Sequence, residues 1–354
     1  MTRLDWLGGK RWLRLLMGGV CALTLTASAP MVNQPAAGTA SSGLPWLSGS
    51  NASSNIASFA NYRGSPLDVT TTWEDDGSWR GTESVWALND SSLNGFAGKL
   101  SVAIPMLSNQ SDSLSACAAG AYDSHFRALG GTLKQYNHPD AFVRLGWEGN
   151  GVGYAWSVGD DPTTWTACFR REVTALRSAD PAVRVDWNMN KEGRVAAQLL
   201  YPGDDYVDVV GVDFYDMYPA YRAQADWDAD YMRTQDGGPR GLGTWLAFAQ
   251  THGKPLSVPE WGVNSGGVGG GFDNPFYIQK MHDFFVANAG SIAYESYFNS
   301  QCPAFCISPA GVNPSASAKY RQLWRASASV PTLTPTPPQH PSQHGLGCGS
   351  SAVS

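Results

Sequence analysis

The stretch Ala141-Phe-Val-Arg-Leu-Gly-Trp-Glu-Gly-Asn150 indicates the architecture of this chain. Its apolar residues predict a buried β-strand that ends on a glutamate, Glu148. A second stretch, Lys254-Pro-Leu-Ser-Val-Pro-Glu-Trp-Gly262, repeats this arrangement and ends its strand on Glu260. A carboxylate at the tip of a buried strand costs free energy. Two such strands therefore indicate that strand tips carry the function, as they do in β/α barrels.

Strands and helices alternate around these two stretches. The predicted strands lie near residues 45–50, 68–73, 100–107, 142–147, 183–187, 206–215, 256–260 and 292–298. Helices are predicted near residues 55–62, 115–134, 162–178, 242–252 and 275–288. Eight strands alternating with helices predict an α/β fold of the (β/α)8 TIM barrel type. A doubly wound open sheet alternates in the same way, but no G-x-G-x-x-G or P-loop pattern follows the early strands.

The two ends of the 354-residue chain differ in composition from the middle. Basic residues precede an apolar stretch that ends on the small residues Ala27-Ser-Ala29, which predicts a signal peptide over residues 1–29; an uncleaved anchor is the alternative. Residues 30–43 are expected to be a linker, residues 44–328 the catalytic domain, and residues 329–354 a disordered tail rich in Pro, Ser and Thr. We therefore expect a secreted monomer, extracellular or periplasmic, with no stable membrane association after cleavage.

Charge and cysteine content narrow the expected partners. A net charge of -6 does not favour a nucleic-acid partner. Export makes disulfides plausible: Cys302 and Cys306 are close enough for a local bridge, and Cys117 and Cys168 lie on consecutive predicted helices and are candidates to pair. Cys21 belongs to the expected signal peptide, and Cys348 stays unassigned. No Cys/His spacing matches a zinc site, so neither a metal nor a cofactor is expected.

Paired carboxylates at strand tips suit one chemistry in particular. Most glycosidases hydrolyse a sugar bond with two carboxyl groups, one protonated and one ionised. The surroundings must keep the two groups in different protonation states. Trp147 and the charge of Glu260 are expected to favour the protonated form of Glu148. Arg144 and the hydroxyl of Tyr215 are expected to favour the ionised form of Glu260.

Three motifs resemble glycoside hydrolase family 26, a clan A barrel family best known for β-mannanases. Arg144-Leu-Gly-Trp-Glu-Gly-Asn-Gly151 resembles the family's fourth-strand pattern, an Arg followed by His-Glu-x-Asn-Gly. The segment from Tyr201 to Tyr215 is similar to its sixth-strand signature, and Lys254–Gly262 to its seventh-strand Lys-Pro-x-x-x-x-Glu-Phe-Gly pattern. The resemblance runs from about residue 44 to 325 and implies the TIM barrel fold.

The resemblance also implies roles for individual residues. Carried over, Glu148 is the acid/base and Glu260 the nucleophile of a retaining mechanism. Asn150 is expected to hydrogen-bond the sugar or to orient Glu148. The remaining expected substrate-binding residues are Arg144, Trp147, Tyr215, Trp261 and Tyr297. Two positions depart from the family: Trp147 replaces the usual His before the acid/base, and the eighth strand has Tyr294, Tyr297 and Phe298, with an extra Glu295, where the clan usually has a Trp sugar platform.

These observations predict a secreted retaining β-glycoside hydrolase, endo-acting on a polysaccharide such as β-mannan. Because sugar contacts lie on variable loops, β-glucan, xylan or an exopolysaccharide are alternative substrates. A non-catalytic barrel that binds a polysaccharide or oligosaccharide is a further alternative. The Gly-rich segment Ser265–Gly271, directly after the proposed nucleophile, is expected to be a rim loop or a lid.

Overall fold

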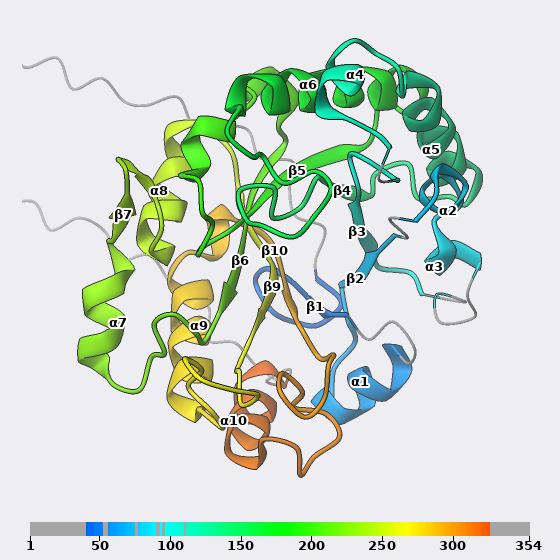
Figure 1. The fold of residues 1–354 in the computed structure, drawn as a ribbon. Coiled ribbons are helices and arrows are strands. Elements are labelled where there is room, and N and C mark those ends of the chain that lie inside the picture. Colours follow the sequence, from blue (N-terminus) through cyan, green and yellow to red (C-terminus); the bar gives the residue numbers. More distant parts are fainter. Residues whose placement is uncertain are drawn as a thin grey trace, which may run out of the picture. The chain divides into compact units, whose positions relative to one another are not determined.

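Eight parallel strands form a closed barrel in the computed structural model, which describes residues 40–51, 56–74, 77–89, 93, 96–109 and 111–325 (Figure 1). β1 pairs with both β2 and β10, which confirms the predicted (β/α)8 barrel and excludes an open sheet. The barrel strands, in the order in which they neighbour one another, are β1 Leu47–Ser50, β2 Val69–Trp73, β3 Lys99–Ile104, β4 Phe142–Leu145, β5 Arg184–Asn190, β6 Val209–Tyr215, β9 Leu256–Gly262 and β10 Ile292–Tyr297.

Helices surround the barrel (Figure 1). The α-helices are α1 Ile56–Arg63, α2 Trp79–Ser84, α3 Trp86–Asn89, α4 Leu114–Ala118, α5 Asp123–Gln135, α6 Pro162–Ala179, α7 Gln224–Tyr231, α8 Leu242–Thr251, α9 Pro275–Ala287 and α10 Pro314–Trp324. Short 3-10 turns are η2 Ala197–Leu200, η3 Asp204–Tyr206 and η4 Ala289–Ser291, and β7 Thr234–Gln235 forms a small hairpin with β8 Gly238–Pro239. None of the helices in the described part of the chain is long and apolar enough to cross a membrane.

Several expected element boundaries need correction. The strand predicted near residues 100–107 ends at Ile104, and the one predicted near residues 206–215 begins at Val209. The helix predicted near residues 115–134 is two helices, α4 and α5, because the chain turns at Gly120, where φ is +89°. β4 stops at Leu145 because Gly146 has a φ of 55°. β5 continues to Asn190, three residues beyond its predicted end. The expected signal peptide, most of the expected linker, the expected tail and Cys21 and Cys348 lie outside the described residues.

The inside of the barrel is apolar at its floor and polar above. Val69, Phe142, Val209 and Tyr294 form a separate buried cluster, one side chain from every second strand, as barrel layers are built. Above them Asp186 accepts hydrogen bonds from the Tyr294 hydroxyl and from Ser257, both at 2.7 Å. The polar side chains that follow along the strands therefore lie toward the carboxyl ends, where a TIM barrel carries its site.

A β-bulge in β9 decides which of its side chains face inward. Val258 is level with Glu295 of β10 and Trp261 with Tyr297, so β9 holds one residue more than its neighbour over this interval. The pairing with β6 shifts in the same place. The extra residue lies at Pro259-Glu260, and a proline is tolerated there because a bulge leaves a residue unpaired. The bulge re-aims β9, so that both Ser257 and Glu260 face the barrel interior.

Two disulfides join described cysteines, as expected. Cys117 on α4 pairs with Cys168 on α6, and Cys302 pairs with Cys306 in the loop after β10. The carboxylate of Glu172 lies against the first bridge, and these three residues form a group with the composition of a metal site. Both sulfur atoms are taken by the bridge, so the group does not fit a metal ion.

Candidate active site

Glu260 is held by three donors from three different strands. Its Oε1 accepts a hydrogen bond from Arg144 at 2.6 Å and from the Trp73 indole at 2.8 Å, and its Oε2 accepts one from the Tyr215 hydroxyl at 2.8 Å. Arg144 comes from β4, Trp73 from the end of β2 and Tyr215 from the end of β6. Donors and a cation around a carboxylate favour its ionised form. Arg144 and Tyr215 therefore contact Glu260 as the sequence predicted, and Trp73 adds a third donor.

Arg144 contacts polar side chains of the barrel interior as well as Glu260. Its side chain is fully buried and also bonds Asn188 at 3.2 Å, with Asp213 4.0 Å away. Burial alone lowers the pKa of Arg144, but the carboxylates of Glu260 and Asp213 raise it above its usual value. A buried guanidinium with such partners stays charged and is costly to replace. Because it is fully buried, Arg144 is a positioning residue for the carboxylate of Glu260 and not the substrate-binding residue that the sequence suggested.

Glu148 lies just past the end of β4, with a left-handed backbone at φ 52°. Its Oε1 accepts a hydrogen bond from Asn190 at the end of β5, and its Oε2 one from the Tyr154 hydroxyl at 3.3 Å. A non-glycine residue in this conformation stores strain, which is typical of functional sites. Burial in the mouth of the barrel, and then the charge of Glu260, raise the pKa of Glu148 to about 7. Glu148 therefore keeps its proton at mildly acidic pH.

A third carboxyl group, Asp213 on β6, lies beneath the pair. Asn188 donates to its Oδ1 at 3.0 Å, while Oδ2 has no hydrogen-bond partner. Burial, together with the charges of Glu260 and Glu148, raises the pKa of Asp213 well above its usual range. An unpaired buried carboxylate is costly, so a neutral Asp213 resolves the accumulation of negative charge.

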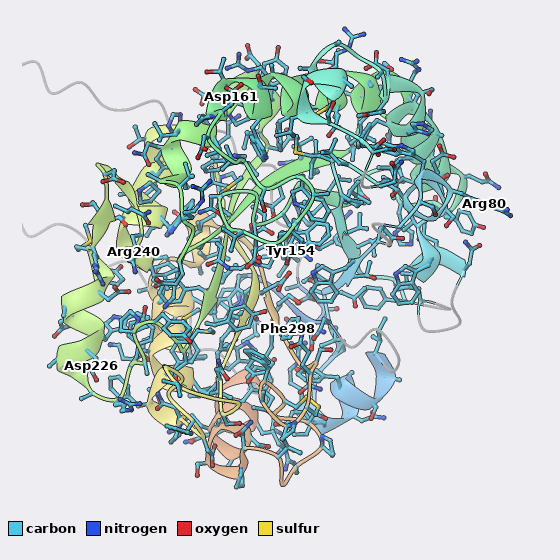
Figure 2. The ribbon with its side chains drawn as sticks, in the orientation of Figure 1. Arg80, Tyr154, Asp161, Asp226, Arg240 and Phe298 are labelled. Atoms are coloured by element: carbon cyan, nitrogen blue, oxygen red, sulfur yellow. A yellow bond between two sulfur atoms is a disulfide. The ribbon has the colours of Figure 1, made fainter. Side chains whose placement is uncertain are left out.

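Aromatic rings line the side of the site next to Glu260. Phe298, directly after β10, packs edge-on against Trp73 at 5.5 Å and Tyr215 at 5.6 Å between ring centroids. Figure 2 shows Phe298 and Tyr154 near the middle of the barrel. Phe298 thus occupies the region where the sequence predicted aromatic residues of the eighth strand, whereas Tyr294 of the same strand lies in the barrel floor.

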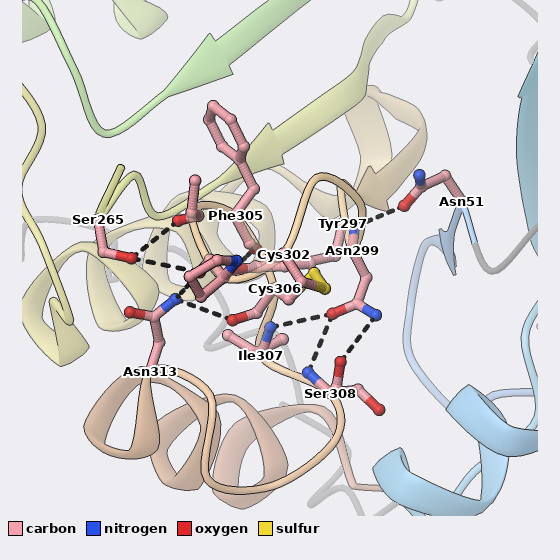
Figure 3. Close-up of a disulfide and its surroundings, with 12 residues drawn as sticks. Asn51, Ser265, Tyr297, Asn299, Cys302, Phe305, Cys306, Ile307, Ser308 and Asn313 are labelled. Carbon is pink, nitrogen blue, oxygen red and sulfur yellow. Dashed lines mark hydrogen bonds between the residues drawn. A yellow bond between two sulfur atoms is a disulfide. The ribbon is translucent and has the colours of Figure 1, made fainter. Parts of the chain in front are cut away.

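The Cys302–Cys306 loop contacts these aromatic rings, and Figure 3 shows its disulfide with the hydrogen bonds around it. Phe305, inside the bridged loop, packs against Tyr215 with ring centroids 5.2 Å apart. Asn313 donates to the carbonyl of Cys306 at 2.9 Å, and Ser265 donates to the carbonyl of Ala304 at 3.1 Å. The loop after β10 and the Gly-rich loop after β9 are therefore fixed to each other beside the proposed nucleophile.

Trp147 and Asn150 lie next to Glu148 and act on its surroundings. Asn150 is buried; its Nδ2 donates to the backbone carbonyl of Asn190 at 2.8 Å, and its Oδ1 accepts from the Asn190 N–H at 2.9 Å. It thereby orients the residue that binds Glu148, and both polar ends of its side chain are taken. Trp147 is 6 % exposed and packs against Trp156 and Tyr154. Both residues help to hold Glu148 in place, and little of either side chain is accessible to a sugar.

Trp261 and Tyr297 do not lie where the sequence interpretation placed them. Both are fully buried. The Trp261 indole donates to Glu295 at 2.6 Å, and the Tyr297 hydroxyl donates to the carbonyl of Phe305 at 3.1 Å. Beyond the bulge, Trp261 points into the layer between the barrel and α10, where it packs on Trp324 at 5.1 Å. Neither side chain is available for substrate binding, so we correct that expectation.

Glu295, noted in the sequence as an additional carboxylate, belongs to the same buried layer. Its oxygens accept hydrogen bonds from three indoles, those of Trp46 at 3.3 Å, Trp261 at 2.6 Å and Trp324 at 2.9 Å. Burial raises the pKa of Glu295, while hydrogen bonds from Ser48, Trp324 and Trp261 oppose the rise. We call this group the tryptophan cage; it is part of the support of the barrel, on the opposite side of β10 from the site.

Sequence reasoning missed Tyr154 and Asn190, the two donors to Glu148. Tyr154 lies in a loop with no pattern that marks it. Asn190 had a signal, since a polar residue at a strand tip was expected to matter, but β5 was predicted to end three residues too early.

Comparison with solved structures identifies the fold of this barrel. GH26C from Muricauda sp. superposes with a TM-score of 0.61 at 15% identity, covering 80% of this chain and 86% of that chain. A modular endo-β-1,4-mannanase from Cellulomonas fimi gives 0.57 at 18% identity, over 79% and 71% of the two chains. A GH26 β-mannanase from Bacteroides ovatus gives 0.56 at 13% identity, over 79% and 89%. The chain has the family 26 glycoside hydrolase fold. At these identities the likeness concerns the fold alone.

Sequence comparison finds a curated relative of this chain. Endoglucanase H of Acetivibrio thermocellus is 25% identical over 340 residues, which cover 90% of this chain. The chain spans about a third of the length of that relative, 35%. A search of protein-family models finds no match.

Proposed function

We propose that this chain is a retaining β-glycoside hydrolase that cleaves a polysaccharide internally, with Glu148 as acid/base and Glu260 as nucleophile. One observation carries the proposal: a carboxylate that accepts hydrogen bonds from three donors, one of them a buried guanidinium, interacts with a second carboxyl whose pKa is raised to about 7. Retaining glycosidases need this division of roles. The family 26 fold and the strand-tip positions of both glutamates support it.

The reaction proceeds in two steps. Glu260 attacks the anomeric carbon while Glu148 gives its proton to the departing glycosidic oxygen, so the sugar bond breaks as the ester bond to Glu260 forms. Glu148, now ionised, takes a proton from water, and the resulting hydroxide displaces Glu260 from the anomeric carbon. Tyr215 and Trp73 receive the leaving carboxylate, because their donors face both of its oxygens.

β-Mannan is the first substrate that we propose, because solved structures with this fold include an endo-β-1,4-mannanase and a further β-mannanase. A β-glucan is the second candidate, because the curated relative is named an endoglucanase. We also propose that the protein is secreted as a monomer and acts outside the cytoplasm. Its two disulfides support an oxidising compartment. Amino-terminal sequencing of the exported protein tests the cleavage site expected near Ala29.

The deciding experiment is product release from a panel of β-mannan, β-glucan, xylan and bacterial exopolysaccharides, with Glu260→Ala as the control. We expect oligosaccharides from one polymer with the wild-type protein and none with the variant. No product from any polymer, with both proteins still binding one of them, would favour the non-catalytic binding barrel and contradict hydrolysis.

Reaction with azide distinguishes the catalytic roles of the two glutamates. In Glu260→Ala azide fills the space of the missing nucleophile, so we expect a glycosyl azide of inverted configuration from an activated aryl glycoside. In Glu148→Ala we expect slow hydrolysis of the glycosyl-enzyme and, with azide, a product of retained configuration. The same anomer from both variants would contradict the assignment of roles.

A further inference from the structure

Two rim loops beside the site pair with each other. One follows β6 at Asp216, and the other is the Gly-rich loop that follows β9. Met217 forms an antiparallel bridge with Gly270, and the N–H of Gly271 donates to the carbonyl of Asp216 at 2.9 Å. The Gly-rich loop is thus tied to the end of β6, which argues against a lid that opens freely.

Tyr218 lies on this paired loop with its ring fixed. Its hydroxyl donates to the carbonyl of Val268 at 2.9 Å. A Cβ added to Gly269, where φ is +94°, would lie 2.3 Å from a ring carbon of Tyr218, so the ring rests directly on the glycine backbone. Tyr218 itself has a φ of 47°, a strained conformation for a tyrosine. The chain therefore accepts strain to hold this ring in place.

Tyr218 is nevertheless 51% exposed. One side is backed by Gly269 and the edge is bonded, while much of the remaining surface is open to solvent. A rigid aromatic ring with an open face is what a pyranose ring stacks on, because the axial C–H groups of a sugar are apolar and the fixed ring loses little entropy on binding.

Its position connects it to the reaction site. Tyr215, whose hydroxyl binds Glu260, is the last residue of β6. Tyr218 follows it by three residues, in the loop after the strand. On the other side of the barrel, Trp86 is 38% exposed and its indole donates to the backbone carbonyl of Trp73 at the end of β2. β2 and β6 are four strands apart in a barrel of eight, which makes them opposite each other. Exposed aromatic residues therefore lie at opposite edges of the mouth, with the two glutamates between them.

We propose that Tyr218, backed by Gly269, is a sugar-binding platform outside the catalytic centre, which stacks on a pyranose ring of the polysaccharide as the chain leaves Glu260 toward β6. This inference rests on the proposed function and adds to it a place where the polymer binds. The partner is a β-linked polysaccharide and not a protein, because this exposed ring follows Tyr215, whose hydroxyl binds Glu260, by three residues on the rim of the barrel.

The test measures polymer binding in the inactive Glu260→Gln background, by affinity electrophoresis in soluble β-1,4-mannan and in soluble β-1,4-glucan. Adding Tyr218→Ala is expected to weaken binding of the recognised polymer about tenfold, a typical value for one aromatic stacking contact. Gly269→Ala, which displaces the ring without removing it, is expected to weaken binding as well. The matched control is Tyr136→Ala, which removes a tyrosine of 38% exposure that follows α5 at the opposite end of the barrel.

The outcomes separate the two proposals. If the wild-type protein cleaves a polymer but Tyr218→Ala binds it as tightly as its parent, the platform is overturned and the hydrolase stands. An equal loss in Tyr136→Ala overturns the platform too, because it shows a non-specific effect. If the wild-type protein neither binds nor cleaves any polymer of the panel, the proposed function fails and the platform fails with it.

Discussion

At the scale of single residues, the site depends on how Glu148 exchanges a proton. Asn190 donates to Oε1, so this oxygen is always an acceptor. The Tyr154 hydroxyl faces Oε2 and is able to accept from the protonated acid or to donate to the ionised one. The transferable proton therefore belongs on Oε2. Tyr154 keeps a partner for Glu148 in both states of the cycle.

We predict that kcat/KM falls above about pH 7, as Glu148 loses its proton. The hydrogen bonds from Asn190 and Tyr154 lower the pKa of Glu148, so removing either raises it. Asn190→Ala and Tyr154→Phe should therefore move the basic limb of the pH profile to higher pH, by about half a unit to one unit. Profiles of kcat/KM measure this shift. Lower rates with an unmoved limb in both variants would mean that the two residues are only structural.

The sequence predicted the two central carboxylates and the anion-stabilising pair Arg144 and Tyr215, because strand tips converge at one end of a barrel. It did not predict the burial of Trp261. That outcome depends on the bulge at Pro259-Glu260, and a bulge arises from pairing with neighbouring strands, which no local pattern records. The sequence placed Asn150 near Glu148, as the structure does. It did not predict the hydrogen bonds to the backbone of Asn190, because these join residues that are 40 positions apart.

At the scale of elements, the two disulfides differ in what they support. Cys117–Cys168 joins two outer helices across 51 positions, whereas Cys302–Cys306 closes a short loop whose Phe305 packs on Tyr215. The loss of entropy in the unfolded chain grows with loop length. The longer bridge should therefore contribute more to stability, and the shorter one more to the geometry around Glu260.

We predict opposite patterns for the two double variants. Cys117→Ala with Cys168→Ala should cost about 4 kcal/mol of stability and lower Tm with little change in kcat/KM. Cys302→Ala with Cys306→Ala should cost about 2 kcal/mol but reduce kcat/KM, because Phe305 no longer fixes Tyr215. Calorimetry and kinetics on both proteins measure the contrast. Equal losses of Tm with unchanged kinetics would contradict it.

At the scale of the whole molecule, the polar barrel interior affects stability as well as chemistry. Burial raises the pKa of Asp186 and of Asp216 to about 6 each, and that of Glu148 to about 7. The folded state thus binds protons that the unfolded chain releases near pH 4, and stability falls as pH rises through these values. His138 and His282, whose pKa values burial lowers, act in the opposite direction near neutrality.

We predict that Tm is highest in mild acid and declines between about pH 4 and pH 7. In Asp186→Asn the carbonyl oxygen can keep both hydrogen bonds that Oδ2 accepts, while no charge is buried. This variant should gain on the order of 3 kcal/mol at pH 8 and little at pH 4. Scans of Tm against pH measure the difference. Asp283→Asn, on the exposed side of α9, is the control; a parallel gain there would refute the explanation.

The architecture of the whole molecule was predictable because the alternation of apolar strands and amphipathic helices repeats along the chain. Helices α2, α3, α7 and α10 were not predicted. The connection from β5 to β6 contains only 3-10 turns among the described residues, where regular alternation would place a helix. Most of the stability of such outer helices comes from packing against their neighbours, which the local sequence does not record.

The tryptophan cage allows closure of the barrel to be followed by intrinsic fluorescence. Its three indoles come from the residue before β1, from β9 and from α10, so they surround Glu295 only when the first and last strands have met. A carboxylate at hydrogen-bond distance changes the emission of an indole, and water replaces it when the seam opens. The fluorescence of this protein therefore contains a natural signal for the joining of its two ends, which a Glu295→Gln substitution would alter without adding any external dye.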